Sequence, residues 1–285
     1  MEDNKDSAHK PASSSMLRTL RYAAPNLVTG ASVVFAVLAL QAALRGEYIW
    51  GAWWALYSTL TDKLDGLVAR TLKASSPLGV QLDSLADLLN YGMVPATITY
   101  GFFLSRPLLG WASGGMNLLL KIICCLYVAC TALRLARFNV SAENPRYFFG
   151  VPSTMSGAVV LAYLVTLGKY SDPSWTPGES YPGWRMLGGL RLDALLPYYP
   201  WVLLVFGWLM VSPLRVPKLG NAGHRALNTY VVTCLLIGYA FGLLHMFPEY
   251  IVFGGLQYLV IATYMHFFAS AKERPAPLFP TEDPA

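Results

Sequence analysis

The sequence predicts an all-α fold, a polytopic membrane helical bundle of about eight transmembrane helices. Hydrophobic residues make up 55% of the 285 residues and charged residues only 13%, about half of the charged fraction that is usual in soluble domains. The apolar residues are gathered into runs close to the ~20 residues that a membrane-spanning helix needs. This composition excludes an ordinary soluble globular domain, so chain length is a poor guide to the number of domains.

Eight apolar runs are predicted to span the membrane. In chain order they are Pro25–Leu44, a run from Ile49 past Tyr57 into an acidic motif, Asp83–Leu104, Met116–Leu135, Thr154–Leu167, Tyr199–Val211, Leu227–Leu244 and Tyr250–Phe268. Pro25 is expected at the start of the first helix, because proline suits the first helical turn. Residues 1–20 are expected to form a polar cytoplasmic segment, residues 21–270 the membrane domain and residues 271–285 a disordered tail.

The basic residues predict the orientation. Eight spans place both termini on one side, and of the 21 lysines and arginines fifteen fall on that side. This positive-inside bias predicts that the termini and the acidic motif face the cytoplasm. It also explains the net charge of +5 through anionic lipid headgroups, so no nucleic-acid partner is expected.

Four carboxylates within a short stretch form the most informative motif. Asp62 and Asp65 are three residues apart, and Asp83 and Asp87 are four apart, so each pair shares one face of a helix. Two helices that each offer two carboxylates make an all-oxygen pocket suited to Mg²⁺ or Mn²⁺. Any one of these acids alone would be read as a solvated residue at a helix end, but four beside apolar sequence indicate function.

Small residues and an arginine lie between these acids, giving the pattern D-x2-D-G-x2-A-R-x8-G-x3-D-x3-D. The pattern resembles the signature of the CDP-alcohol phosphatidyltransferases at every fixed position. The resemblance implies a phosphatidyltransferase domain over residues 21–270 and a two-metal site for Mg²⁺ or Mn²⁺, with Asp87 as the general base. The implied metal ligands are Asp62, Asp65, Asp83 and Asp87. The implied nucleotide-binding residues are Asn26, Gly66, Ala69, Arg70 and Gly79.

A second motif, Arg134-Leu135-Ala136-Arg137-Phe138-Asn139, ends the fourth run. Its two arginines share a helical face and suit a carboxylate or a phosphate, although positive-inside anchoring would also place arginines there. Together with Pro25–Thr29, Lys73–Ser76 and Phe149–Pro152, the motif resembles bacterial and archaeal phosphatidylserine synthases over about residues 20–160. The resemblance implies substrate-binding roles for Ser75, Ser76, Arg134, Arg137 and Asn139. Lys63 and Leu67 depart from the glycine and arginine that are usual in that subgroup.

The expected activity is therefore transfer of the phosphatidyl group of CDP-diacylglycerol to the hydroxyl of L-serine, which gives phosphatidylserine and CMP. The expected location is the bacterial cytoplasmic membrane, with the active site facing the cytoplasm and membrane lipids around the protein. Open alternatives are glycerol 3-phosphate, inositol phosphate or choline as acceptor, a divalent-cation transporter, and an inactive scaffold. A transporter is disfavoured because the acids lie at one rim and not at the bilayer midplane. Homodimers are common in the family, and no residue identifies one here.

Overall fold

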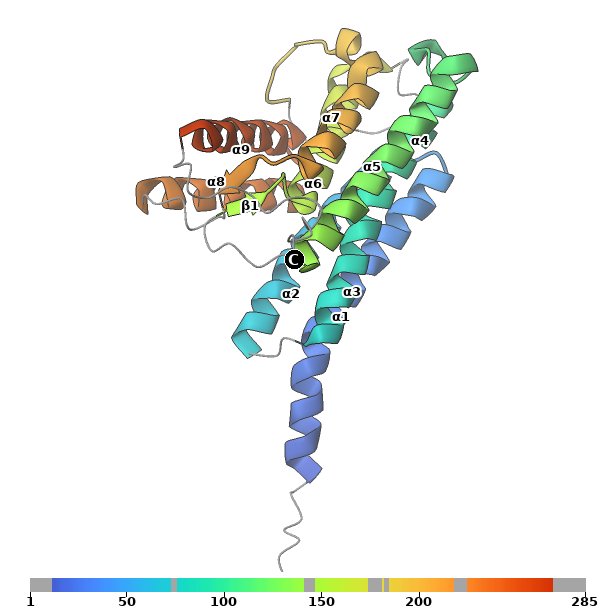
Figure 1. The fold of residues 1–285 in the computed structure, drawn as a ribbon. Helices are drawn as coiled ribbons and strands as arrows, with labels where there is room; N and C mark the ends of the chain where they lie inside the picture. Colours follow the sequence, from blue (N-terminus) through green and yellow to red (C-terminus); the bar gives the residue numbers. More distant parts are fainter. Residues whose placement is uncertain are drawn as a thin grey trace, which may run out of the picture.

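The computed structural model describes residues 12–72, 76–140, 147–173, 181, 185–217 and 225–268. As predicted, this part of the chain is mostly helical (Figure 1). The helices are α1 (Ala12–Leu44), α2 (Tyr48–Leu72), α3 (Pro77–Asp87), α4 (Val94–Leu104), α5 (Gly114–Val140), α6 (Ser153–Tyr170), α7 (Tyr199–Val211), α8 (Arg225–Leu243) and α9 (Pro248–Phe268). A π-helix, η1 (Leu88–Met93), joins α3 to α4 without a break. The described helices therefore follow the predicted order of eight segments.

Among the described residues, three helices are long and apolar enough to cross a membrane: 26–44, 114–140 and 193–211. The last of these combines a short 3₁₀ segment, η4 (Asp193–Tyr198), with α7. The other helical segments are shorter in apolar length or carry polar residues, as α2 does where it enters the acidic motif. Eight helical segments are thus confirmed, whereas eight transmembrane crossings stay a prediction.

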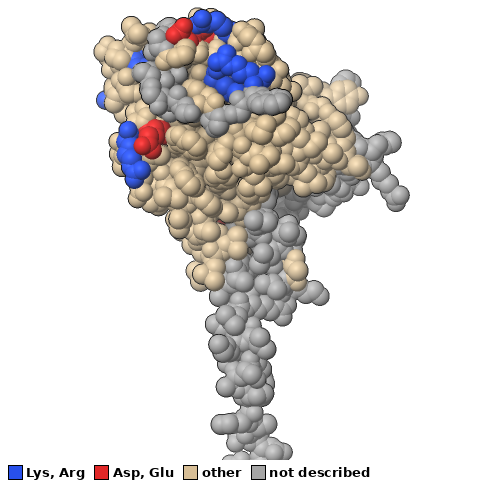
Figure 2. All heavy atoms as spheres, turned by 180° about the vertical axis from the view of Figure 1, so that it is seen from behind, with Lys and Arg blue, Asp and Glu red and all other residues tan. Residues whose placement is uncertain are grey.

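Two features of the surface fit a lipid-embedded protein. Figure 2 shows the charged side chains of this face gathered at the top and at the left edge of the view. Most of the described surface below them is uncharged. Large apolar side chains are exposed on helices far apart in sequence, among them Leu118, Val205, Trp208 and Val260. Such an exposed apolar surface is costly in water and favourable in a bilayer.

The long helices pack closely through small residues. The turn at Gly46, whose φ is +80°, joins α1 to α2. A Cβ at Gly51 would lie 2.9 Å from the carbonyl oxygen of Ala39, so the two backbones meet where there is no side chain. Large aromatic side chains, including Trp53, Tyr127 and Tyr199, fill the core between the helices.

The two C-terminal helices lie across the other helices in the view of Figure 1. α9 packs on α6, where Gly255 lies against Val159 so closely that a Cβ at Gly255 would clash with a methyl of Val159. A two-stranded antiparallel ribbon of β1 (Tyr147–Phe149) and β2 (Arg215–Pro217) connects the chain after α5 with the chain after α7. The ribbon was not predicted, because three-residue strands leave too short a periodic pattern in the sequence.

The prediction that the first helix starts at Pro25 is wrong. α1 begins at Ala12, so Pro25 lies inside it, and residues 12–20 of the predicted polar segment are helical. Proline removes one backbone donor from a helix, at a cost of about 3 kcal/mol. The residues before it, which include alanine, leucine, methionine and arginine, favour helix strongly enough for the helix to continue. The predicted disordered tail, 271–285, lies outside the described residues.

Candidate active site

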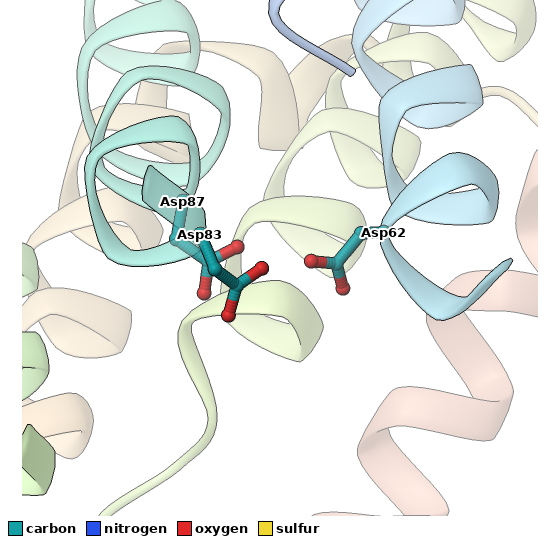
Figure 3. A group of neighbouring side chains, drawn as sticks. All are labelled: Asp62, Asp83 and Asp87. Carbon is teal, nitrogen blue, oxygen red and sulfur yellow. The ribbon is translucent and has the colours of Figure 1, made fainter. Parts of the chain in front are cut away.

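Three carboxylates from two helices point toward one another (Figure 3). Asp62 comes from α2, and Asp83 and Asp87 lie one turn apart on α3. One carboxylate oxygen of each lies within 4.8 Å of the others. Asp87 is buried, and the other two are partly buried. The prediction that two helices bring their acids together is thus confirmed for three of the four.

For the other predicted residues of the acidic motif on α2, the structure describes the helix backbone but not the side chains. The backbone of α2 continues to Leu72, but the side chains of Asp65, Gly66, Ala69 and Arg70 lie outside the described residues, and so does Ser75. Their assigned roles stay predictions.

The carboxylates repel one another at this separation, because each carries a negative charge when ionised. The Arg134 guanidinium offsets part of this charge through its attraction to Asp87 and Asp62. A single arginine cannot neutralise three carboxylates. Closely spaced carboxylate oxygens from rigid helices are the donor set that hard divalent cations such as Mg²⁺ and Mn²⁺ prefer, so the residues present fit a metal.

The start of α3 brings three predicted residues together. The Ser76 hydroxyl accepts a hydrogen bond of 3.0 Å from the Gly79 N–H and caps the helix, and Pro77 occupies its first turn. A Cβ at Gly79 would lie 3.1 Å both from Ser76 Oγ and from Asn26 Oδ1 of α1. Asn26, Ser76 and Gly79 therefore meet at one point, with the glycine leaving the space between them open.

We predict that Gly79→Ala weakens binding of the nucleotide part of the substrate. The added methyl must displace Asn26 or Ser76, and overpacking of this kind costs about 1–3 kcal/mol. The expected result is a higher KM for the CDP-linked donor with a smaller change in kcat. Gly30→Ala on α1 is the matched control, because a Cβ there meets nothing within 4 Å. An unchanged donor KM in Gly79→Ala would show that this glycine does not border the nucleotide.

The π-helix η1 begins at the residue after Asp87. Pro95 has no N–H, so the helical hydrogen bond from residue 95 to the carbonyl of residue 91 cannot form. The N–H of the preceding residue, Val94, bonds to the carbonyl of Leu89, five residues back and not four, as in a π-helix. The wider turn changes the face that α4 presents relative to α3. Asp87 can therefore face α2 while Ile98 and Phe102 of α4 stay in the core. Pro95 was the available sequence signal for this π-helix, which was not predicted.

Residues of η1 fix its position against three other helices. The Asn90 amide donates a hydrogen bond of 3.3 Å to Ser32 Oγ on α1. Tyr91 packs so closely on α6 that a Cβ at Gly157 would lie 2.9 Å from its ring. Gly92 lies against Thr131 of α5. Asp87 thus stands on a helix that is held on several sides.

The two predicted arginines have different surroundings. Arg134 points toward the acids and donates a hydrogen bond of 2.7 Å to Ser153 Oγ at the start of α6. Ser153 in turn lies 3.5 Å from Asp87 Oδ2. The Arg137 guanidinium instead lies over the Phe149 ring of β1, 5.8 Å from its centre. Sequence spacing alone assigned both arginines to one face and did not distinguish these roles.

Asn139, predicted to bind substrate, contacts α3. Its amide donates to Ser84 Oγ at 2.9 Å, and the single Ser84 hydroxyl hydrogen faces two acceptors, the Val80 carbonyl at 3.0 Å and Asn139 Oδ1 at 3.3 Å. This pair joins the end of α5 to the turn that carries Asp83 and Asp87. Asn139 therefore helps to hold the acidic residues in place, and a direct substrate contact stays a prediction.

The sequence from within α1 to the end of α7 matches a known family. Residues 22–212 fit the description "CDP-alcohol phosphatidyltransferase", and this range contains the three converging carboxylates and Arg134. The chain belongs to the CDP-alcohol phosphatidyltransferase family. Three of the four carboxylates that the resemblance singled out, Asp62, Asp83 and Asp87, are thus brought together by the fold.

Several relatives within the family carry one name. A CDP-diacylglycerol–serine O-phosphatidyltransferase of Helicobacter pylori strain 26695 is 25% identical over 247 residues, which cover 84% of this chain and 92% of the relative. The protein of that name from strain J99 is 28% identical over 179 residues, 62% of this chain and 72% of the relative. A Saccharomyces cerevisiae protein of that name is 35% identical over 171 residues, 55% and 54% of the two chains.

Proposed function

We propose that this membrane protein transfers the phosphatidyl group of CDP-diacylglycerol to the hydroxyl of L-serine, giving phosphatidylserine and CMP. The observation that carries the proposal is the cluster of Asp62, Asp83 and Asp87 beside Arg134 in a chain of the CDP-alcohol phosphatidyltransferase family. Serine as the acceptor rests on the printed names of the bacterial and yeast relatives.

In the proposed reaction the carboxylates have two roles, metal binding and proton acceptance. Asp62, Asp65, Asp83 and Asp87 would hold Mg²⁺ or Mn²⁺, and the bound cation would supply positive charge against the pyrophosphate and the departing CMP. Asp87, the buried member, accepts the proton of the serine hydroxyl as that oxygen attacks the phosphorus of the phosphatidyl group. A P–O bond forms to serine, the P–O bond to CMP breaks, and CMP leaves with the bonding electrons.

The neighbouring residues position the substrates. We propose that Asn26, Gly66, Ala69, Arg70 and Gly79 border the cytidine nucleotide, where small residues let a flat ligand approach the backbone. Arg134 binds an anionic group, either the serine carboxylate or the lipid phosphate, because its planar fork matches such groups. Ser75, Ser76, Arg137 and Asn139 complete the proposed substrate site. The site faces the cytoplasm of a bacterial inner membrane in a bundle of eight spans, in keeping with the distribution of lysine and arginine.

An acceptor screen tests this function. Purified protein in mixed micelles with CDP-diacylglycerol and Mn²⁺ is given serine, glycerol 3-phosphate, inositol phosphate or choline, and CMP and the lipid product are measured. We expect CMP release with serine and phosphatidylserine as product. CMP release with another acceptor only would overturn the serine assignment and leave the transfer chemistry standing. Divalent-cation flux in proteoliposomes without CMP release would favour the transporter.

We predict that activity requires a divalent metal, because the carboxylates and the pyrophosphate repel one another without one. Chelation with EDTA should abolish CMP release, and Mg²⁺ or Mn²⁺ in excess over the chelator should restore it. Ca²⁺ at the same concentration is the control for ionic strength and for nonspecific charge screening. Full activity in excess chelator would contradict metal catalysis.

Alanine substitutions at Arg134 and at Arg137 should differ in their effect on activity, because the two arginines have different surroundings. We expect Arg134→Ala to lose about 1.5–3 kcal/mol in kcat/KM, the scale of a hydrogen bond to a charged group. Arg137→Ala should lose less, because Arg137 lies on Phe149. Lysine should rescue Arg134 poorly, since it lacks the fork. KM values measured separately for serine and donor tell which substrate each arginine serves. Unchanged constants in both alanine variants would leave them as topology anchors.

A further inference from the structure

Ser153 lies at the junction of three helices and was not singled out by the sequence motifs. It is the first residue of α6 and is fully buried. Its hydroxyl accepts the 2.7 Å hydrogen bond from Arg134 Nη1 of α5 and faces Asp87 Oδ2 of α3 at 3.5 Å. The hydroxyl is thus interposed between the basic and the acidic group of the site.

The direction of the first hydrogen bond fixes the role of the hydroxyl. A guanidinium can only donate, so Ser153 Oγ must act as its acceptor. The single hydroxyl hydrogen is then free to point toward the Asp87 carboxylate. Within the part of the chain that the structure describes, Arg134 and Asp87 make no direct ion pair, although they attract each other. Ser153 is the group that lies between them.

A direct ion pair between Arg134 and Asp87 would make both groups less available to other ligands. A guanidinium that chelates the Asp87 carboxylate would occupy the oxygens needed for a metal or a proton, and it would no longer be available to a substrate anion. A neutral hydroxyl between the two groups preserves their attraction and keeps the carboxylate open to other ligands. A short side chain that can accept on one side and donate on the other meets this requirement.

We propose that Ser153 is a positioning residue that keeps Arg134 and Asp87 apart, so that Asp87 stays available to metal and Arg134 to substrate. The proposal rests on the proposed function for its kinetic readout. It deepens that function by explaining how the opposite charges of Arg134 and Asp87 can lie in one site without forming a direct ion pair. If the hydroxyl is removed, Arg134 should move onto Asp87 and compete with the cation.

The test measures Mn²⁺ affinity by electron paramagnetic resonance of free Mn²⁺ with the full chain in detergent. Three proteins are compared: Ser153→Ala, Arg134→Ala and the double variant. We expect Ser153→Ala to bind Mn²⁺ about tenfold more weakly and to lose about 10- to 100-fold in kcat/KM, the scale of a lost hydrogen bond to charged groups. In the double variant Mn²⁺ affinity should recover, because the competing guanidinium is gone, and kcat/KM should fall no further than in Arg134→Ala.

Ser156→Ala is the matched control, because Ser156 is equally buried on the same helix and its hydroxyl has no hydrogen-bond partner. Thermal unfolding verifies that each variant is folded, and Ser153→Cys, which keeps the side-chain volume, replaces the alanine variant if that one is not monodisperse. Unchanged Mn²⁺ affinity in a folded Ser153 variant would overturn the proposal, as would an equal loss with and without Arg134. The Mn²⁺ measurement needs no acceptor, so a failure of the serine assignment would be seen separately.

Discussion

Asp87→Asn should abolish most turnover while leaving the fold and donor binding largely intact. Asp87 is the buried member of the carboxylate cluster, and an amide of the same shape cannot accept the proton of the attacking hydroxyl. Loss of a general base typically costs about 10²–10⁴-fold in rate. The measurement is kcat for CMP release at saturating donor and serine, together with the donor KM. We expect kcat to fall and the donor KM to change little.

Asp172→Asn is the matched control for this substitution. Asp172 lies just beyond α6, at the opposite end of that helix from Ser153, and is partly exposed in an ion pair with Arg191. An α-helix of this length places it roughly 25 Å from the start of α6. Asp172→Asn should therefore leave turnover unchanged. Near-normal kcat in Asp87→Asn would exclude Asp87 as the base, and a large rise in donor KM would indicate that its main role is to hold metal and donor.

The sequence predicted the helices well, because each apolar run is long enough to report burial or lipid contact over several turns. It also predicted that Asp62, Asp83 and Asp87 converge, because fixed spacing places the acids of α3 on one face and the family pattern pairs them with α2. The convergence of these three carboxylates was thus readable from local patterns. Helix ends were less accurate, as Pro25 shows, because a single proline can be tolerated where its neighbours favour helix.

Features that depend on distant residues were not predictable in this way. Ser153 approaches Asp87 across 66 positions of the chain, and although it directly follows the Phe149–Pro152 motif, no local pattern predicts that it reaches Asp87. The β1–β2 ribbon joins segments that α6 and α7 separate. Pairing of this kind is decided by tertiary packing, which a single sequence does not encode in a local pattern.

The buried ion pair of Lys169 and Glu249 is a further long-range contact, outside the candidate active site. Lys169 Nζ lies 3.1 Å from Glu249 Oε1, and both side chains are almost completely buried. The Tyr170 hydroxyl and the Met186 N–H also donate to Glu249 Oε1. The network therefore joins the end of α6, the segment before η4 and the start of α9.

Lys169→Met should destabilise the protein strongly, because it leaves the Glu249 carboxylate buried without its positive partner. Breaking one side of a buried ion pair costs about 3–5 kcal/mol, whereas replacing both partners by apolar groups can be close to neutral. We therefore expect Lys169→Met to lower the Tm in detergent substantially and the double variant Lys169→Met/Glu249→Met to recover much of the loss.

Arg191→Met is the control for this pair, because Arg191 makes exposed ion pairs with Asp172 and Asp193, and solvent-exposed pairs contribute little to stability. Its Tm should remain close to that of the unmodified protein. A single Lys169→Met variant as stable as the unmodified protein would show that the carboxyl of Glu249 is satisfied by Tyr170 and the Met186 N–H alone. A double variant that is no more stable than the single one would show instead that the charges themselves hold α9 against α6.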